Sequence, residues 1–187
     1  MGLSERPKIV GPDSGPEPPF PIRMKGTVVS GFGRGSKDLG IPTANLPVEN
    51  VPWIDSQPTG VYFGWAGILL PSAHPALLHP SAAPPPPPAQ IAAGWRTFPM
   101  VMSIGYNPFY KNTVRSAEVH VMHEFGKDFY GCAMAISILG YIRPELDYVS
   151  MEALIGDIRT DIEIAGTSLR REMWMRGDAY LWGGEES

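Results

Sequence analysis

Hydrophobic and polar positions alternate along several short stretches of this chain, the pattern of β-strands that bury one face. The alternation is clearest in residues 116–125, where small apolar side chains take turns with Glu118 and His120. Turn-forming residues separate the stretches from one another. The pattern predicts strands at residues 22–29, 43–46, 60–70, 98–106, 116–125 and 131–142.

The period changes after residue 150, where apolar residues recur at steps of three and four, as on one face of an α-helix. Ser150 is a suitable N-cap, and Glu152 places an acid in the first turn. We expect a helix of about 20–25 residues that ends near Gly177. Because strands come first and do not alternate with helices, the fold class predicted is mainly β: a closed antiparallel barrel with a long C-terminal helix on its flank.

Two segments break the strand pattern. Residues 1–21 are rich in proline and charge, so we expect a disordered N-terminal segment before a folded domain at 22–187. Residues 71–98 are also rich in proline and include an unbroken proline run at 84–88. Such a run favours polyproline II and cannot join a sheet ladder, so we expect a mobile insertion at a hairpin tip. It is either a plain spacer or a ligand for SH3-like partners.

Composition excludes several classes of function. The net charge is −4 and charged residues make up 18% of the 187 residues, so a basic stripe for nucleic acid is not expected. No apolar run is long enough to predict a membrane span. A lone cysteine, Cys132, fits a reducing compartment, and residues 1–21 lack the apolar region of a signal peptide. A cytoplasmic protein, expected to be a monomer, is the simplest interpretation.

A glycine-rich stretch, GFGRGSKDLGIPTAN, occupies residues 31–45. Its glycines permit close backbone approach to a ligand, and Arg34 and Lys37 add positive charge, so a phosphate group is a natural guest. The spacing matches neither the P-loop nor the dinucleotide-binding fingerprint. A flexible turn would have the same composition, and the residues alone do not decide between the two.

Thr43 and Asn45 follow Pro42 and lie two residues apart, so on an extended chain both side chains point the same way. A hydroxyl and an amide carbonyl are hard oxygen donors of the kind that suits Mg²⁺. The alternative is that both side chains satisfy nearby backbone groups.

Glu118 and His120 share the polar face of the strand predicted at 116–125. A carboxylate there could take the proton of an alcohol that attacks phosphorus. Alternatively, Glu118 pairs with Arg115 or Lys111 at the surface, and His120 is an ordinary hydrogen-bonded side chain. Aromatic residues beyond the helix either hold a flat substrate or close the core: Trp174, Tyr180 and Trp182.

Three long motifs together resemble the riboflavin kinase family: GFGRGSKDLGIPTANLP at 31–47, SIGYNPFYKNTVRSAEVHVMHEFGKDFYG at 103–131 and GYIRPE at 140–145. The resemblance covers roughly residues 22–70 and 98–170 and is closest to the monofunctional eukaryotic type. It implies a six-stranded antiparallel Greek-key barrel that phosphorylates the 5′-hydroxyl of riboflavin to FMN. It also implies ATP as co-substrate with Mg²⁺, Zn²⁺ serving in some members.

The resemblance also implies roles for single residues. Glu118 would be the catalytic base, and Thr43 and Asn45 would hold the metal. Arg143 and His120 are candidates for contact with the flavin substrate. The candidates for ATP contact are Gly31, Gly33, Arg34, Gly35, Lys37 and Thr43.

Other functions stay open at this point. A barrel that carries or senses flavin without catalysis would keep the aromatic pocket and abandon the phosphate loop. An interaction module would use the proline run. Since no second nucleotide-binding domain follows the helix, FAD synthetase activity is not expected.

Overall fold

The computed structural model describes residues 6–29, 43–79, 81–106, 114–125 and 127–185. The strands in this part of the chain are β1 (Ile22–Thr27), β2 (Ala44–Leu46), β3 (Gly60–Leu69), β4 (Trp95–Tyr106), β5 (Arg115–Val121) and β6 (Ala133–Arg143). The α-helices are α1 (Pro88–Ala93) and α2 (Met151–Leu169). Short 3₁₀ helices are η2 (Pro75–Leu78), η4 (Glu172–Trp174) and η5 (Ala179–Trp182).

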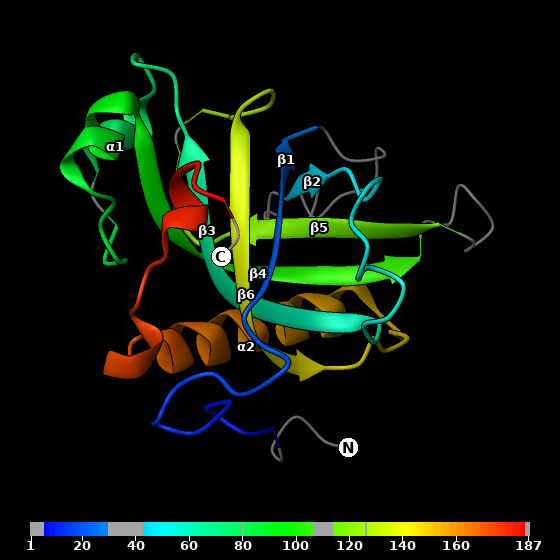
Figure 1. Ribbon diagram of the computed structural model, residues 1–187. Coiled ribbons are helices and arrows are strands. Elements are labelled where there is room, and N and C mark those ends of the chain that lie inside the picture. Colours follow the sequence, from blue (N-terminus) through cyan, green and yellow to red (C-terminus); the bar gives the residue numbers. More distant parts are fainter. Residues whose placement is uncertain (1–5, 30–42, 80, 107–113, 126, 186–187) are drawn as a thin grey trace.

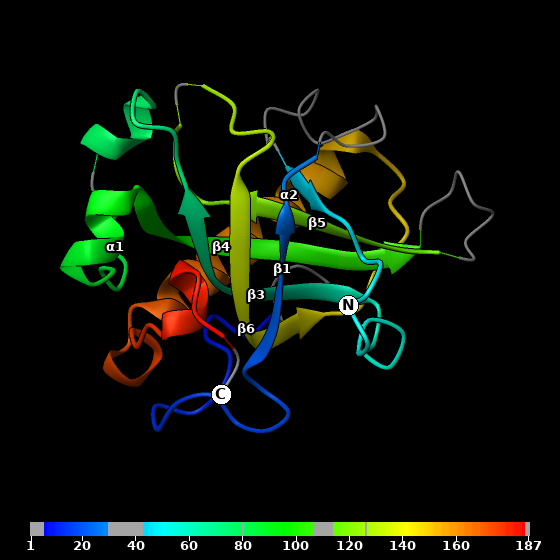
Figure 2. The same ribbon diagram turned by 45° about the horizontal axis from the view of Figure 1, so that its top comes forward.

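The strands form one antiparallel sheet in the order β1-β6-β3-β4-β5-β2. β3, β4 and β5 are consecutive neighbours and β6 returns beside β3, which is a Greek key. Beyond β1, Val29 pairs with Asn45 of β2 through backbone hydrogen bonds of 3.0 and 3.2 Å. The two edges of the sheet therefore meet, and the sheet curls on itself (Figures 1 and 2). The predicted antiparallel Greek-key barrel with a long helix on its flank is confirmed.

One face of each strand fills the barrel interior. In β5, Ala117, Val119 and Val121 are buried while the residues between them are half-buried, as the alternation predicted. Their apolar neighbours include large side chains from β3, β4 and β6: Tyr62, Ile68, Phe98, Met100, Met102, Ile104, Met134, Ile136 and Ile138. The interior is thus a packed core, so ligands must bind elsewhere.

The outer face of β3 and β4 packs against α2, which crosses this side of the barrel in Figure 1. Phe63 stacks on Trp174 with ring centroids 5.8 Å apart, and Trp65 donates from Nε1 to the Trp174 carbonyl at 2.8 Å. These contacts hold Trp174, and with it η4, against β3. The helix therefore ends at Leu169, and the prediction that it runs to near Gly177 is wrong. No helix in the described ranges has the length and apolarity to cross a membrane.

The N-terminal segment differs from the disordered tail expected for residues 1–21. From residue 6 onward it lies along α2, beneath the helix in Figure 1. The Val10 amide donates to Ser168 Oγ at 3.0 Å, Arg171 Nη2 donates to the Val10 carbonyl at 2.5 Å, and Trp174 Nε1 donates to the Pro12 carbonyl at 2.9 Å. Apart from the side chains of Arg6 and Asp13, which form ion pairs, these contacts use the backbone of the segment, so its side-chain pattern did not predict the docking.

The connection between β3 and β4 also differs from the expected mobile insertion. It contains η2 and α1, and Ala76 reaches the barrel core with 1% of its surface exposed. Pro84 and Pro86 are buried, with Pro84 against Gly177, which removes two prolines of the run from any SH3-like partner. β4 begins at Trp95, so the connection ends earlier than predicted.

Candidate functional site

Polar side chains form a row across the outer face of the sheet. Asn45 of β2 is the direct partner of Glu118 in β5, and Glu118 is opposite Ser103 in β4. The same line of paired residues passes through the apolar Val61 of β3 and ends at Arg143 of β6. Because directly paired residues point to the same face, the register alone brings Asn45 beside Glu118.

A cavity of about 350 Å³ lies between this row and α2. It contains four of the residues singled out in the sequence, namely Thr43, Glu118, His120 and Arg143. The rest of its wall comes from β3 and β4, from the segment after β6 and from α2: Val61, Val101, Met102, Ser103, Glu145, Leu146, Tyr148, Leu154, Ile158 and Asp161. We call it the small pocket.

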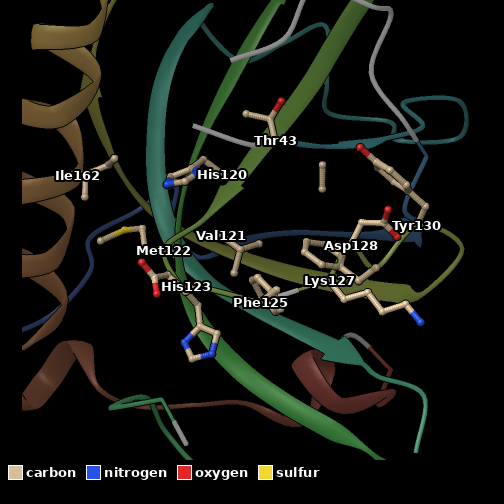
Figure 3. A pocket seen from close by; sticks show the side chains of 13 residues that line it. Thr43, His120, Val121, Met122, His123, Phe125, Lys127, Asp128, Tyr130 and Ile162 are labelled. Atoms are coloured by element: carbon tan, nitrogen blue, oxygen red, sulfur yellow. The ribbon is translucent and has the colours of Figure 1, made fainter. Parts of the chain in front are cut away.

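A second cavity, of about 990 Å³, adjoins the first and is shown in Figure 3. Thr43 and His120 line both cavities. Ile162 of α2 closes one side, and the segment after β5 forms most of the remaining wall: Met122, His123, Glu124, Phe125, Lys127, Asp128, Phe129 and Tyr130. We call it the large pocket.

Glu118 is half-buried at the centre of the small pocket. Burial raises the pKa of its carboxyl, and the nearby charge of Glu145 raises this pKa further. The surface pair with Arg115 considered from the sequence is not formed, because Arg115 donates to the backbone carbonyls of Gln57 and Asp55 at 2.6 and 3.3 Å. Lys111 lies outside the described residues.

Glu145 is a second carboxylate in the same pocket. A Cβ placed on Gly105 would lie 2.3 Å from Glu145 Oε1, so the carboxylate rests directly on the bare backbone of β4. Burial raises the pKa of Glu145, while the charges of Arg143 and Arg115 lower it. Glu145 lies within the motif GYIRPE, but the sequence alone indicated no role for it.

Arg143 lines the small pocket with its guanidinium already engaged. Its Nε and Nη2 donate to Asp161 of α2 at 3.0 and 2.8 Å, and both side chains are at least nine-tenths buried. Burial lowers the pKa of Arg143, but the hydrogen bond and charge of Asp161 outweigh it, so the pKa is raised. Contact between Arg143 and a substrate stays a prediction.

The ion pair extends to the N-terminal segment. Arg6 Nη2 also donates to Asp161 Oδ1, and Arg6 Nη1 lies 3.5 Å from Asp157 Oδ1. Tyr148 donates its hydroxyl to Asp157 at 2.8 Å. Burial and this hydrogen bond raise the pKa of Tyr148 to about 12. Asp157 and Asp161, four residues apart on α2, are both buried. Two acids at that spacing among the inward positions of a helix are a signal that the sequence reasoning missed.

Asn45 is 4% exposed, and its Nδ2 has no hydrogen-bond partner within the described part of the chain. A half-turn about χ2 exchanges the amide nitrogen and oxygen, so the carbonyl can occupy the same place. Thr43 and Asn45 therefore fit a hard cation such as Mg²⁺. The described ranges hold no cluster of three or more His, Cys, Asp or Glu side chains of the kind that zinc prefers.

The remaining predictions divide in two. The loop candidates lie outside the described residues: Gly31, Gly33, Arg34, Gly35 and Lys37. Trp174, Tyr180 and Trp182 are buried, and Trp182 Nε1 donates to Thr97 Oγ1 at 2.7 Å. Of the two alternatives left open for these aromatic residues, the structure supports closure of the core.

The barrel resembles a solved structure, that of riboflavin kinase from Trypanosoma brucei, with a TM-score of 0.58 and 24% identity over 84% of this chain and 85% of the other. At that identity the likeness concerns the fold. The flavokinase family model, described as riboflavin kinase, matches residues 18–169. Riboflavin kinase of Pyricularia oryzae is 58% identical over 91% of this chain and 82% of its own length. Riboflavin kinase of Neurospora crassa is 46% identical, over 97% and 92%. The chain therefore belongs to the riboflavin kinase family, which confirms the resemblance drawn from its motifs.

Proposed function

We propose that this enzyme transfers the γ-phosphate of ATP to the 5′-hydroxyl of riboflavin, giving FMN and ADP. The observation that carries the proposal is the direct pairing of Asn45 with Glu118 on the outer face of the barrel. It sets an oxygen donor for a cation beside a carboxylate that can act as a base. Phosphoryl transfer needs these two functions side by side.

The two pockets suggest separate places for the two substrates. In the small pocket Arg143 is neutralised by Asp161, which leaves Glu118 and Glu145 facing the space. Two carboxylates repel a triphosphate, whereas they can accept hydrogen bonds from a hydroxyl-rich, uncharged acceptor such as riboflavin. The large pocket offers Phe125 and Phe129 for stacking of a purine ring. Because Thr43 and His120 belong to both pockets, the reacting groups would meet there.

Thr43 and Asn45 would hold Mg²⁺ through their side-chain oxygens. The ion, when bound, neutralises charge on the phosphates. The glycine-rich loop from Gly31 to Lys37 would cover the same phosphates, as the family resemblance implies. Zn²⁺ in this place, a monomeric state and a cytoplasmic location stay predictions.

Glu118 would act as the general base. The riboflavin 5′-oxygen attacks the γ-phosphorus, the bond from that phosphorus to the bridging oxygen breaks, and ADP leaves with the electron pair. The hydroxyl proton passes to the Glu118 carboxylate. Burial and the charge of Glu145 raise the pKa of Glu118, which makes the carboxylate a stronger base than an ordinary surface glutamate.

The direct test is incubation of the protein with riboflavin and MgATP, followed by chromatography for FMN and ADP. Formation of both in equal amounts is expected. A flavin carrier or sensor would bind riboflavin or FMN in a titration and form no FMN. That result would replace the kinase proposal with the carrier alternative.

A further inference from the structure

The connection between β3 and β4 touches the wall of the large pocket through one buried histidine. His74, directly before η2, is 5% exposed. The backbone N–H of Ala76 donates to its Nδ1 at 3.1 Å, and its Nε2 lies 3.1 Å from the carbonyl oxygen of Asp128. Since Nδ1 accepts, Nε2 carries the proton and donates to Asp128. His74 thus joins η2 to a residue of the pocket wall.

The same histidine supports the aromatic part of this wall. Its ring meets Phe125 edge to face, with centroids 6.1 Å apart at 76°. Phe125 in turn packs on Phe129, with centroids 4.5 Å apart. Both phenylalanines line the large pocket. Ala76, two residues after His74, is buried in the barrel core, so the histidine is held from behind.

The wall segment has a second anchor farther along the chain. The Gly131 amide donates to the Val28 carbonyl at 2.8 Å, which ties the end of the segment to the strand edge beyond β1. Between Phe125 and Gly131, Asp128 is the residue whose backbone carbonyl His74 binds. Loss of that hydrogen bond would free the part of the wall that carries Lys127 and Asp128.

We propose that His74 is a positioning residue for the nucleotide, acting through Asp128 and Phe125 on the wall of the large pocket. The inference rests on the proposed function, which places the nucleotide there. It also gives the connection between β3 and β4 a role: the connection supports the nucleotide side of the active site. The small pocket has no wall residue in this contact, so riboflavin binding should not depend on His74.

The test compares His74→Asn with His74→Ala. The side-chain oxygen of asparagine can still accept the hydrogen bond from the Ala76 backbone N–H, as an N-cap does. The side chain is too short to keep the hydrogen bond to Asp128. The loss of one buried hydrogen bond predicts that the KM for ATP rises about 3- to 10-fold in H74N. The kcat and the KM for riboflavin should stay within about twofold of wild type. Calorimetry with MgADP should show the same fold-change in Kd, independently of turnover.

His79→Asn is the matched control, since it makes the same chemical change five residues later at an exposed position. It should leave the KM for ATP unchanged. The inference is wrong if H74N binds MgADP with the affinity of wild type. It is also wrong if the KM for ATP and the KM for riboflavin rise together and the unfolding midpoint falls, because His74 would then be merely structural. If H74A does not fold, the MgADP affinity and KM values of H74N alone still test the proposal. Wild-type protein that binds no MgADP and forms no FMN would refute the proposed function itself, a result distinct from the others.

Discussion

The two pockets meet at Thr43 and His120 but are held together by different forces. The small pocket is set by strand register and by charge: Glu118 sits on a regular strand, and Arg143 and Asp161 join the sheet to α2. The wall of the large pocket is an irregular segment, held by tilted and edge-to-face ring contacts and by hydrogen bonds between neutral groups. The groups proposed to react thus lie where the backbone is most constrained, and the larger cavity lies where the backbone is least constrained.

The buried charges of Asp157 and Asp161 explain why Arg6 of the N-terminal segment binds beside the small pocket. Asp157 and Asp161 are both less than a tenth exposed, and an unpaired buried carboxylate would be strongly destabilising. Arg143 and Tyr148 satisfy part of their hydrogen-bonding capacity, and Arg6 supplies a second positive charge. The segment before the barrel therefore supports Asp161, a residue of the pocket wall.

The largest effect is expected for Glu118→Gln, which removes the base while it keeps the size of the side chain. Turnover should fall by about 10²-fold or more, since loss of a general base usually costs that much. Binding of MgADP in the large pocket should be almost unchanged. Steady-state kinetics and calorimetry measure the two effects. Wild-type turnover in this variant would remove Glu118 from the mechanism.

The same variant should lose no stability at neutral pH. The folded-state pKa of Glu118 is raised, so ionisation of this carboxylate works against folding, and its stabilising contribution is lost as pH rises through the folded pKa. Glutamine is free of this penalty. Thermal unfolding at neutral pH should place E118Q at or above wild type, and a clearly lower midpoint would contradict the burial argument.

Next in size is Arg143→Gln, which leaves Asp161 with Arg6 as its positive partner. Removal of one member of a buried pair destabilises by on the order of 3 kcal/mol. Arg6→Gln should cost less, because Arg143 still forms its three hydrogen bonds to Asp161. Urea unfolding of both variants measures the difference. Equal losses would mean that the N-terminal segment matters as much as the pair between β6 and α2.

The paired change Thr43→Ala and Asn45→Ala should weaken MgADP binding by about tenfold, through loss of the two proposed oxygen ligands. ADP titrated without Mg²⁺ serves as the control and should show a smaller difference between wild type and variant, since Thr43 is also a candidate for direct contact with the nucleotide. Unchanged affinity for MgADP would contradict the metal assignment, although the position of Glu118 would stand.

The smallest effect is expected for Glu145→Gln. Because the charge of Glu145 raises the pKa of Glu118, its removal lowers that pKa. Activity that depends on ionised Glu118 should then persist to lower pH, so the acid limb of the plot of kcat/KM against pH moves to lower pH. Glu152→Gln, an exposed change at the start of α2, is the control and should leave the limb in place. A limb that does not move in E145Q would show that the two carboxylates act independently.

The sequence predicted β5 because alternate residues of this strand are buried, which produces an alternating pattern directly. It predicted β3, which is buried on both faces, from a run of aromatic and branched residues. β5 and β3 were located to within a few residues. The helix was predicted too long, and the sequence did not indicate the contacts that residues 6–21 and the connection between β3 and β4 make with the rest of the fold. These parts are held by backbone carbonyls and buried prolines, which leave no periodic trace in the side chains.

What the chain determined by itself was the alternation of the strands, since this depends on residue type and spacing. It also singled out Thr43, Asn45 and Glu118 as candidates, and the resemblance to the riboflavin kinase family supplied their proposed roles. The tertiary structure decided their surroundings. It placed Glu145 beside Glu118, turned Arg143 to Asp161 and joined His74 to Asp128. Each of these contacts spans elements distant along the chain, so only the packing of the whole fold brings the partners within the few ångströms over which charges and hydrogen bonds act.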